Sequence, residues 1–283
     1  MPIFGTVPEI TRVSHQRSSG ISDDVDFEIN GSEMQFVEIE LDPGESAIAE
    51  AGSMMHKDAD IDMDSIFGDG SKSSGGLLDA ITGAGKRILT GESLFSTLFT
   101  HEGQGKARVA FAAPYPGQIL AIKLDTVGGK LICQKDSFLC AARGVSIGIF
   151  FQRRILTGLF GGEGFIMQSL EGDGWVFVHV GGTVVERELK PGEELHVDTG
   201  CVAAITSQVG FDVMRAGSIK SMIFGGEGMF LAKLTGPGKI WLQSLPFSRL
   251  AGRMLAAAGP AGQHKGEGSL LGPLGGILDG DNR

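Results

Sequence analysis

The chain has 283 residues, of which 42% are hydrophobic, so it can bury a sizeable core as one large β domain or as two or three smaller units. Its 34 acidic residues outnumber its 24 basic residues, and the resulting net charge of −10 argues against general binding to nucleic-acid phosphates. Three cysteines are too few and too dispersed for a disulfide framework or a zinc ribbon. We therefore expect the cysteines to act as small apolar side chains in a protein of a reducing compartment.

Residues 1–25 mix proline, serine, histidine and charged residues, which is typical of a weakly ordered lead-in. This segment lacks the basic start and apolar centre of a secretory signal. The chain contains no window of about 18 uninterrupted apolar residues, the length that a membrane-spanning helix needs. We therefore expect a soluble, cytoplasmic protein.

The next segment has the pattern of short strands separated by tight turns. Apolar residues at Phe27 and Ile29 precede an Asn30-Gly31 turn, and a second apolar run ends before Pro43-Gly44. This pattern predicts a hairpin followed by another strand.

Four aspartates, at positions 58, 60, 62 and 64, alternate with apolar residues, which predicts a strand with all four carboxylates on one face. A calcium site is one interpretation, but Met63 and Asp69 stand where an EF-hand loop needs glycine and glutamate. A solvated strand face that resists edge-to-edge pairing is favoured instead.

The strand pattern breaks over residues 65–92, and we interpret this segment as a helical insertion. Its apolar residues recur at helical spacing, at Leu77, Leu78, Ile81, Ala84, Ile88 and Leu89. Two glycines weaken such a helix by roughly 1 kcal/mol each, so it needs a surface to lie on. Packing on the β body is favoured over binding to a membrane or a partner.

A long internal repeat dominates the second half of the chain. The segment GGEGFIMQSLEGDGWVFVHVGG at 161–182 returns as GGEGMFLAKLTGPGKIWLQSLP at 225–246. Each copy reads as a β-hairpin with an x-Gly-x-Gly turn, and we expect positive φ angles at Gly172, Gly174, Gly236 and Gly238.

A second repeated motif extends the repeat to three copies. LDPGESAIAEAGS at 41–53 resembles LKPGEELHVDTGC at 189–201, with a fainter copy, VGGKLICQKDSF, between them. We predict an all-β fold with three tandem repeats. The repeats run over 26–125, 126–182 and 183–246, and the first copy's hairpin turn is expected at Tyr115-Pro116-Gly117. Residues 247–283 predict a short helix near Arg249–Ala258 and a flexible tail.

No catalytic signature occurs in the sequence. The GxSxG elbow is absent, and the glycine clusters introduce strands rather than the helices that phosphate loops require. Each histidine, including His179 and His196, is expected to be satisfied by hydrogen bonds or to face solvent. We expect no enzymatic activity and no cofactor.

Three glutamates are the candidate binding residues: Glu102, Glu163 and Glu227. If three repeats surround an axis, equivalent carboxylates could jointly hold a cation or a basic group of a partner. The alternative is that each is an ordinary turn residue between glycines.

Several segments resemble one known family, namely FEINGSEMQFVEIELDPGESAIAEAGSMM, KRILTGESLF, the 161–182 repeat and LKPGEELHVDTGCVAAI. They are similar to the uncharacterised proteins that include the "altered inheritance of mitochondria" type of mitochondrial biogenesis protein, over most of residues 26–246. The resemblance implies a fold like the tryptophan RNA-binding attenuation protein, with three tandem antiparallel β-sandwich units of double-stranded β-helix type around a pseudo-threefold axis. It implies no established catalytic residues. Its mitochondrial members are associated with inner-membrane organisation.

Together these features predict a non-enzymatic interaction or scaffold protein that has a protein partner and forms homo-oligomers. Three alternatives stay open: a peripheral membrane factor, a small-ligand or metal-binding β protein, and an RNA-binding regulator by analogy of fold alone.

Overall fold

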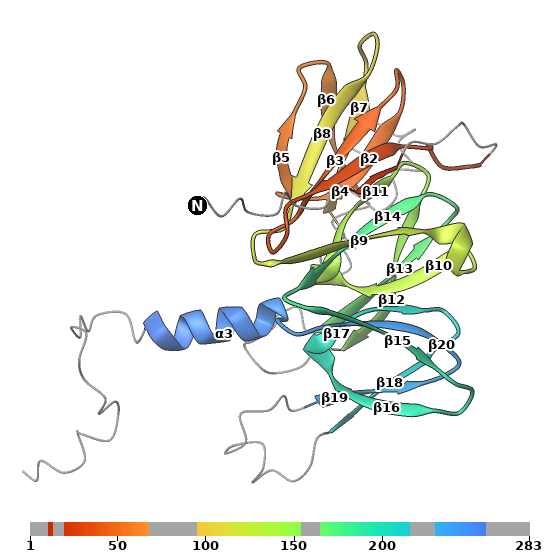
Figure 1. The fold of residues 1–283 in the computed structure, drawn as a ribbon, viewed down its shortest axis with the longest axis vertical. Coiled ribbons are helices and arrows are strands. Elements are labelled where there is room, and N and C mark those ends of the chain that lie inside the picture. The colour runs from red at the N-terminus through yellow and green to blue at the C-terminus, as the bar shows by residue number, and fades with distance from the viewer. Residues whose placement is uncertain (1–10, 14–19, 68–94, 154–164, 216–229, 259–283) are drawn as a thin grey trace, which may run out of the picture.

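A computed structural model describes residues 11–13, 20–67, 95–153, 165–215 and 230–258 of the chain (Figure 1). These residues are predominantly β, which confirms the predicted fold class. The predicted C-terminal helix is also confirmed as α3 (Phe247–Ala258), which begins two residues before the expected start. The predicted helical insertion lies outside the described residues, except that Ser65–Phe67 ends a strand.

The strands form four sheets. The first sheet has the order β1 (Thr11–Val13), β2 (Asp26–Asn30), β3 (Phe36–Leu41), β8 (Ala107–Ala112) and β5 (Met54–Lys57). The second has the order β6 (Ile61–Phe67), β7 (Phe95–His101), β4 (Ser46–Glu50), β11 (Phe138–Ala142), β14 (Trp175–Gly181) and β9 (Gly117–Lys123).

The third sheet has the order β12 (Ser146–Arg153), β13 (Phe165–Glu171), β10 (Lys130–Gln134), β17 (Val202–Thr206), β20 (Gly238–Gln243) and β15 (Val184–Leu189). The fourth has β16 (Glu194–Asp198), β19 (Phe230–Thr235) and β18 (Gly210–Arg215). Short 3₁₀ turns connect some strands, at η1 (Leu124–Val127), η2 (Lys135–Ser137) and η4 (Thr199–Cys201).

In Figure 1 the first sheet lies at the top together with β6 and β7 of the second sheet, and the third and fourth sheets lie toward the bottom. Apolar clusters fill the spaces between successive sheets. The central strands of the second sheet, β4, β11 and β14, are therefore buried on both faces. In β14, Phe177 belongs to the cluster shared with the first sheet, whereas Val176 and Val178 belong to the cluster shared with the third. Such strands are apolar without alternation, because neither face meets water.

One pairing scheme recurs three times along the chain. Its four antiparallel pairs are β3–β8, β4–β7, β5–β8 and β6–β7, then β9–β14, β10–β13, β11–β14 and β12–β13, then β15–β20, β16–β19, β17–β20 and β18–β19. The pairs β4–β11 and β10–β17 join each set to the next within one sheet. A pseudo-threefold axis and the predicted repeat boundaries stay predictions.

The predicted hairpins of the long repeat are wrong. β13 lies in the third sheet and β14 in the second, while β19 lies in the fourth and β20 in the third, so neither pair shares a ladder. The glycine-rich turns are corners between stacked sheets. The equivalent corner of the first set connects β7 to β8 over residues 102–106, and it is not the predicted Tyr115-Pro116-Gly117 turn, which leads from β8 to β9.

Two of the four glycines predicted to have positive φ angles have them, Gly172 at 143° and Gly238 at 140°. Gly174 and Gly236 do not, and the reason for glycine there is space. A Cβ atom at Gly174 would lie 2.7 Å from the Cβ of Ser22, and one at Gly236 would lie 2.7 Å from the Cβ of Leu189.

Cys133 and Cys140 are fully buried, as predicted for small apolar core residues, and Cys201 is partly buried. Burial raises the pKa of both the Cys133 and the Cys140 thiols. Both side chains are therefore protonated at neutral pH.

Candidate functional site

The three predicted glutamates are not brought together within the described residues. Glu102 is exposed in the corner between β7 and β8. Glu163 and Glu227 lie outside the described residues. Their joint site therefore stays a prediction.

The strand pairing changes which residue is equivalent to Glu163 and Glu227. Glu163 precedes β13 by two residues, and Glu227 precedes β19 by three. Each of these two strands pairs with two other strands. The corresponding strand of the first set is β7, and the glutamate that precedes it by three residues is Glu92. Glu102 follows β7 instead. Sequence reasoning missed Glu92, although the segment TGESLF carries the signal.

His101 shapes the corner that carries Glu102. Its side chain is 1% exposed, its Nδ1 accepts from the backbone N–H of Gly103 (3.3 Å), and its Nε2 lies 3.1 Å from the carbonyl oxygen of Gly105. Nδ1 also lies 3.4 Å from the carbonyl oxygen of Asp60, so the buried ring connects the corner to the turn before β6. The prediction of a satisfied histidine is confirmed here.

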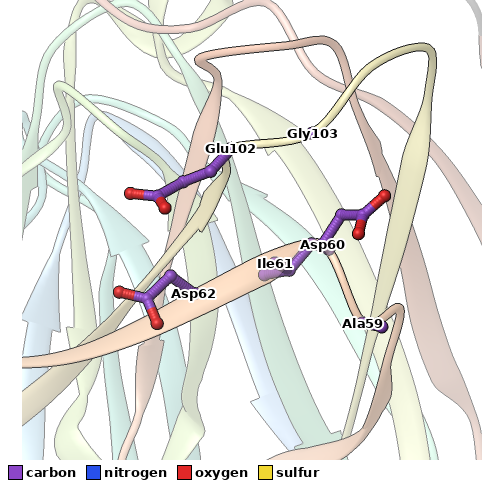
Figure 2. Close-up of a pocket in the computed structure, with 6 residues that line it drawn as sticks. All are labelled: Ala59, Asp60, Ile61, Asp62, Glu102 and Gly103. Atoms are coloured by element: carbon purple, nitrogen blue, oxygen red, sulfur yellow. The ribbon is translucent and has the colours of Figure 1, made fainter.

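An open acidic pocket of about 280 Å³ adjoins this corner. Six residues line it, namely Ala59, Asp60, Ile61, Asp62, Glu102 and Gly103 (Figure 2). The backbone N–H of Glu102 donates to the carbonyl oxygen of Asp60 (3.0 Å) and fastens the corner to the start of β6. In Figure 2 the carboxylates of Glu102 and Asp62 extend toward the same side, and that of Asp60 extends toward the other.

Two carboxylates that extend toward the same side suit a single basic group better than a metal ion, which needs more ligands. Within the described ranges no group of three or more His, Cys, Asp or Glu side chains is placed to hold a metal ion. The prediction that four aspartates share one strand face is wrong. Asp58 and Asp60 lie in the turn before β6, where the Asp58 carboxylate accepts from the backbone N–H of Arg108 (2.8 Å).

Replacing His101 with leucine should lower the free energy of unfolding by about 2 kcal/mol. The backbone N–H of Gly103 and the carbonyl oxygen of Gly105 would then lose their hydrogen-bond partner next to a buried side chain. Chemical denaturation of the purified chain measures this change. His196 is exposed in β16, so His196→Leu is the matched control and should change stability by less than about 0.5 kcal/mol. Equal effects of the two substitutions would contradict the assigned role of His101.

His179 departs from the prediction for histidines. It is 1% exposed, and both ring nitrogens lack a hydrogen-bond partner among the described residues. Its ring meets that of Tyr115 edge to face, with centroids 4.5 Å apart. Desolvation lowers the pKa of His179 to about 4, and the backbone of Tyr115 opposes part of that shift. The ring is therefore neutral at physiological pH.

α3 is attached to the sheets at its first turns. The Arg249 guanidinium lies 3.6 Å from the Asp198 carboxylate and 3.6 Å from the Cys201 sulfur. The ring of Phe247 lies 5.4 Å, centroid to centroid, from that of Tyr115. Beyond these contacts the helix projects away from the body (Figure 1). No helix among the described residues is long and apolar enough to cross a membrane.

One side of α3 carries an apolar stripe at helical spacing, which consists of Phe247, Leu250, Ala251, Met254 and Leu255. The side chains of Phe247, Met254 and Leu255 are 43%, 63% and 70% exposed. The opposite side carries Arg249 and Arg253, and the helix contains no acidic residue. A 12-residue helix is marginal alone in water, and most helices are stabilised by burying their apolar face.

Comparison with known proteins identifies the family. The model of the family described as mitochondrial biogenesis AIM24 matches residues 27–245. The chain belongs to the AIM24 family. An uncharacterised protein of Streptococcus pyogenes is 29% identical over 245 residues, which cover 85% of this chain and 94% of that protein.

A crystal structure of a protein from Streptococcus pyogenes resembles this AIM24-family chain with a TM-score of 0.65 and 25% identity. The match covers 82% of this chain and 99% of the other. The resemblance to a family that includes mitochondrial biogenesis proteins is thereby confirmed. The fold like the tryptophan RNA-binding attenuation protein stays a prediction.

Proposed function

We propose that this AIM24-family chain is a non-enzymatic interaction or scaffold protein. The observation that carries the proposal is the exposed apolar stripe of α3. A helix that projects from the body with Met254 and Leu255 in water leaves apolar area that association would bury.

The acidic pocket supports the same proposal from a different part of the surface. Asp62 and Glu102 are exposed and directed to the same side, so they suit a lysine or arginine of a partner. Exposed pairs of this kind contribute little affinity, typically below about 1 kcal/mol, but they help to set orientation. Net charge opposes the RNA-binding alternative, because a chain at −10 repels phosphates on average.

The size of the native assembly tests this proposal. In a gentle extract of the source cell, the full chain should elute in an assembly heavier than its own 29.7 kDa, together with stoichiometric partners or further copies. Elution of all the chain at its monomer mass, at native concentration, would overturn an interaction or scaffold role. Proximity labelling of the same chain then names any partner.

A further inference from the structure

We propose that the chain joins a second copy head to tail, with the outer edge of β16 in one copy paired antiparallel to the outer edge of β5 in the next. This surface goes beyond the proposed function, because it includes neither α3 nor the acidic pocket. The proposal comes from the incomplete sheets at the two ends of the molecule.

The first and fourth sheets are complementary parts of one six-stranded sheet. Each complete sheet joins three strands of one set to three strands of the next set, in the order β6-β7-β4-β11-β14-β9 or β12-β13-β10-β17-β20-β15. The fourth sheet stops at β16, which corresponds to β4 and β10, and the repeated part of the first sheet stops at β5, which corresponds to β11 and β17. Joined through these two strands, the sheets give the order β18-β19-β16-β5-β8-β3, which is the complete pattern.

One chain cannot complete this sheet by itself. β5 lies in the upper part of the molecule and β16 in the lowest part (Figure 1). Among the described residues, no strand pairs with the outer edge of either. An open edge offers its backbone N–H and C=O groups to another strand. The strand type that is missing at each end is the one that a second copy carries at its opposite end.

The two junctions within the chain define the register of the proposed one. In the β4–β11 pair, the third residue of β4, Ile48, faces the fourth residue of β11, Ala141. In the β10–β17 pair, Ile132 faces Ile205, again a third residue opposite a fourth. The same rule therefore fixes which residues of β16 and β5 would meet.

Charges on the two edges are complementary in this register. His196, the third residue of β16, lies opposite Lys57, the fourth residue of β5. Glu194 and Asp198, two positions to either side of His196, become the diagonal neighbours of Lys57. Within its own chain the Lys57 ammonium donates to two backbone carbonyl oxygens, at 2.7 and 3.4 Å, which leave its charge unneutralised.

Both copies carry a net charge of −10, so the local charges decide whether this contact is favourable. A basic residue of one copy meets two acidic residues of the other, although Glu194 and Asp198 also have basic neighbours in their own chain, Lys233 at 2.6 Å and Arg249 at 3.6 Å. The two edges differ, so further copies can add at each free end. Strands of four and five residues make a small contact, and we expect a dissociation constant on the order of 100 μM. Dilute extracts therefore contain the junction in dissociated form.

Disulfide trapping on the full chain tests the register. The background is Cys201→Ser, since Cys133 and Cys140 are fully buried. A Lys57→Cys chain and a His196→Cys chain are mixed at about 100 μM each and mildly oxidised. Opposed residues of an antiparallel pair have Cα atoms about 4.5–5.5 Å apart, a distance that a disulfide spans. The mixture should give a covalent dimer of twice the chain mass, and either chain alone should give little.

The control for trapping is Arg187→Cys, which is exposed on β15 in a different sheet. It takes the place of His196→Cys and should give little covalent dimer with Lys57→Cys. Equal yields from the two mixtures would overturn the proposed register.

Charge reversal tests the recognition between the two edges. In sedimentation equilibrium, the mass of the wild-type chain should rise above 29.7 kDa as its concentration increases. Lys57→Glu and Glu194→Lys should each weaken this self-association about 10-fold, because like charges then lie on neighbouring strands. An equimolar mixture of the two variants should recover it, since each supplies the native edge that the other lacks. Arg187→Glu changes the net charge by the same −2 as Lys57→Glu and should behave as wild type.

Two further results would overturn the junction: a chain that keeps its monomer mass up to about 1 mM, or a self-association that Lys57→Glu leaves unchanged. The first result would mean that the polar side chains of β5 and β16 keep these edges unpaired, as charged residues do on many edge strands. The interaction role of α3 would still stand in either case, because the native assembly in extracts tests it separately.

Discussion

Replacing Phe177 with alanine is expected to lower the free energy of unfolding by about 4 kcal/mol. The side chain is fully buried in the cluster between the first and second sheets, where its ring packs edge to face on Phe27 with centroids 4.8 Å apart. Its strand, β14, is paired on both sides and covered on both faces. The surrounding structure therefore has little freedom to collapse into the cavity. Denaturant unfolding measures the change.

Phe150→Ala is the control for this prediction. Phe150 is 42% exposed at the edge strand β12, so its removal should cost no more than about 1 kcal/mol. If Phe177→Ala cost as little as Phe150→Ala, the layered packing of the first two sheets would be contradicted.

Acid should destabilise the protein through His179. The pKa of His179 in the folded chain is about 4, below its ordinary value of 6.5, because burial disfavours the charged ring. Above pH 6.5 the ring is neutral in both the folded and the unfolded chain, so its titration does not change the free energy of unfolding. As the pH falls from 6.5 toward 4, only the unfolded chain takes up the proton, so stability is lost over this window, by about 3 kcal/mol in total.

Unfolding of wild type and His179→Phe at several pH values isolates this contribution. The variant has no titrating ring, so the difference in free energy of unfolding between the two proteins should change by about 3 kcal/mol between pH 6.5 and pH 4. Carboxylates whose pKa is lowered by ion pairs, such as Glu171 with Lys130, affect both proteins equally. A difference that does not depend on pH would contradict the unpartnered, buried state of His179.

The elements themselves could be predicted from the sequence, but their assignment to sheets could not. Apolar runs and turn residues located β13, β14, β19 and β20 within a few residues. Because these strands lie in stacked sheets and several are buried on both faces, they lack the alternation that would show which face meets which neighbour. Short loops made hairpins the simplest interpretation, yet Gly172 and Gly238 turn the chain into the next layer.

The candidate site was predictable in part for the same reason. Glu102 could be selected from the sequence as a candidate, and the structure places it at an acidic pocket with Asp62, but its role in binding stays a prediction. Its equivalence to Glu163 and Glu227 depended on the hairpin assignment and fails with it. The burial of His179 could not be predicted from the sequence, because the residues that pack against its ring, such as Tyr115, are far away in the chain. The α3 helix was predicted from the sequence, whereas the exposure of its apolar side was found only in the structure.

The size of the native assembly, compared between two variants of α3, tests the proposed interaction role most directly. In a gentle extract of the source cell, the wild-type chain and Arg253→Glu should both elute in an assembly heavier than 29.7 kDa, whereas Met254→Glu/Leu255→Glu should elute at the monomer mass because its exposed apolar stripe is interrupted by charge. Both variants change the net charge by −2. Equal elution of the two variants would contradict the role of the α3 stripe.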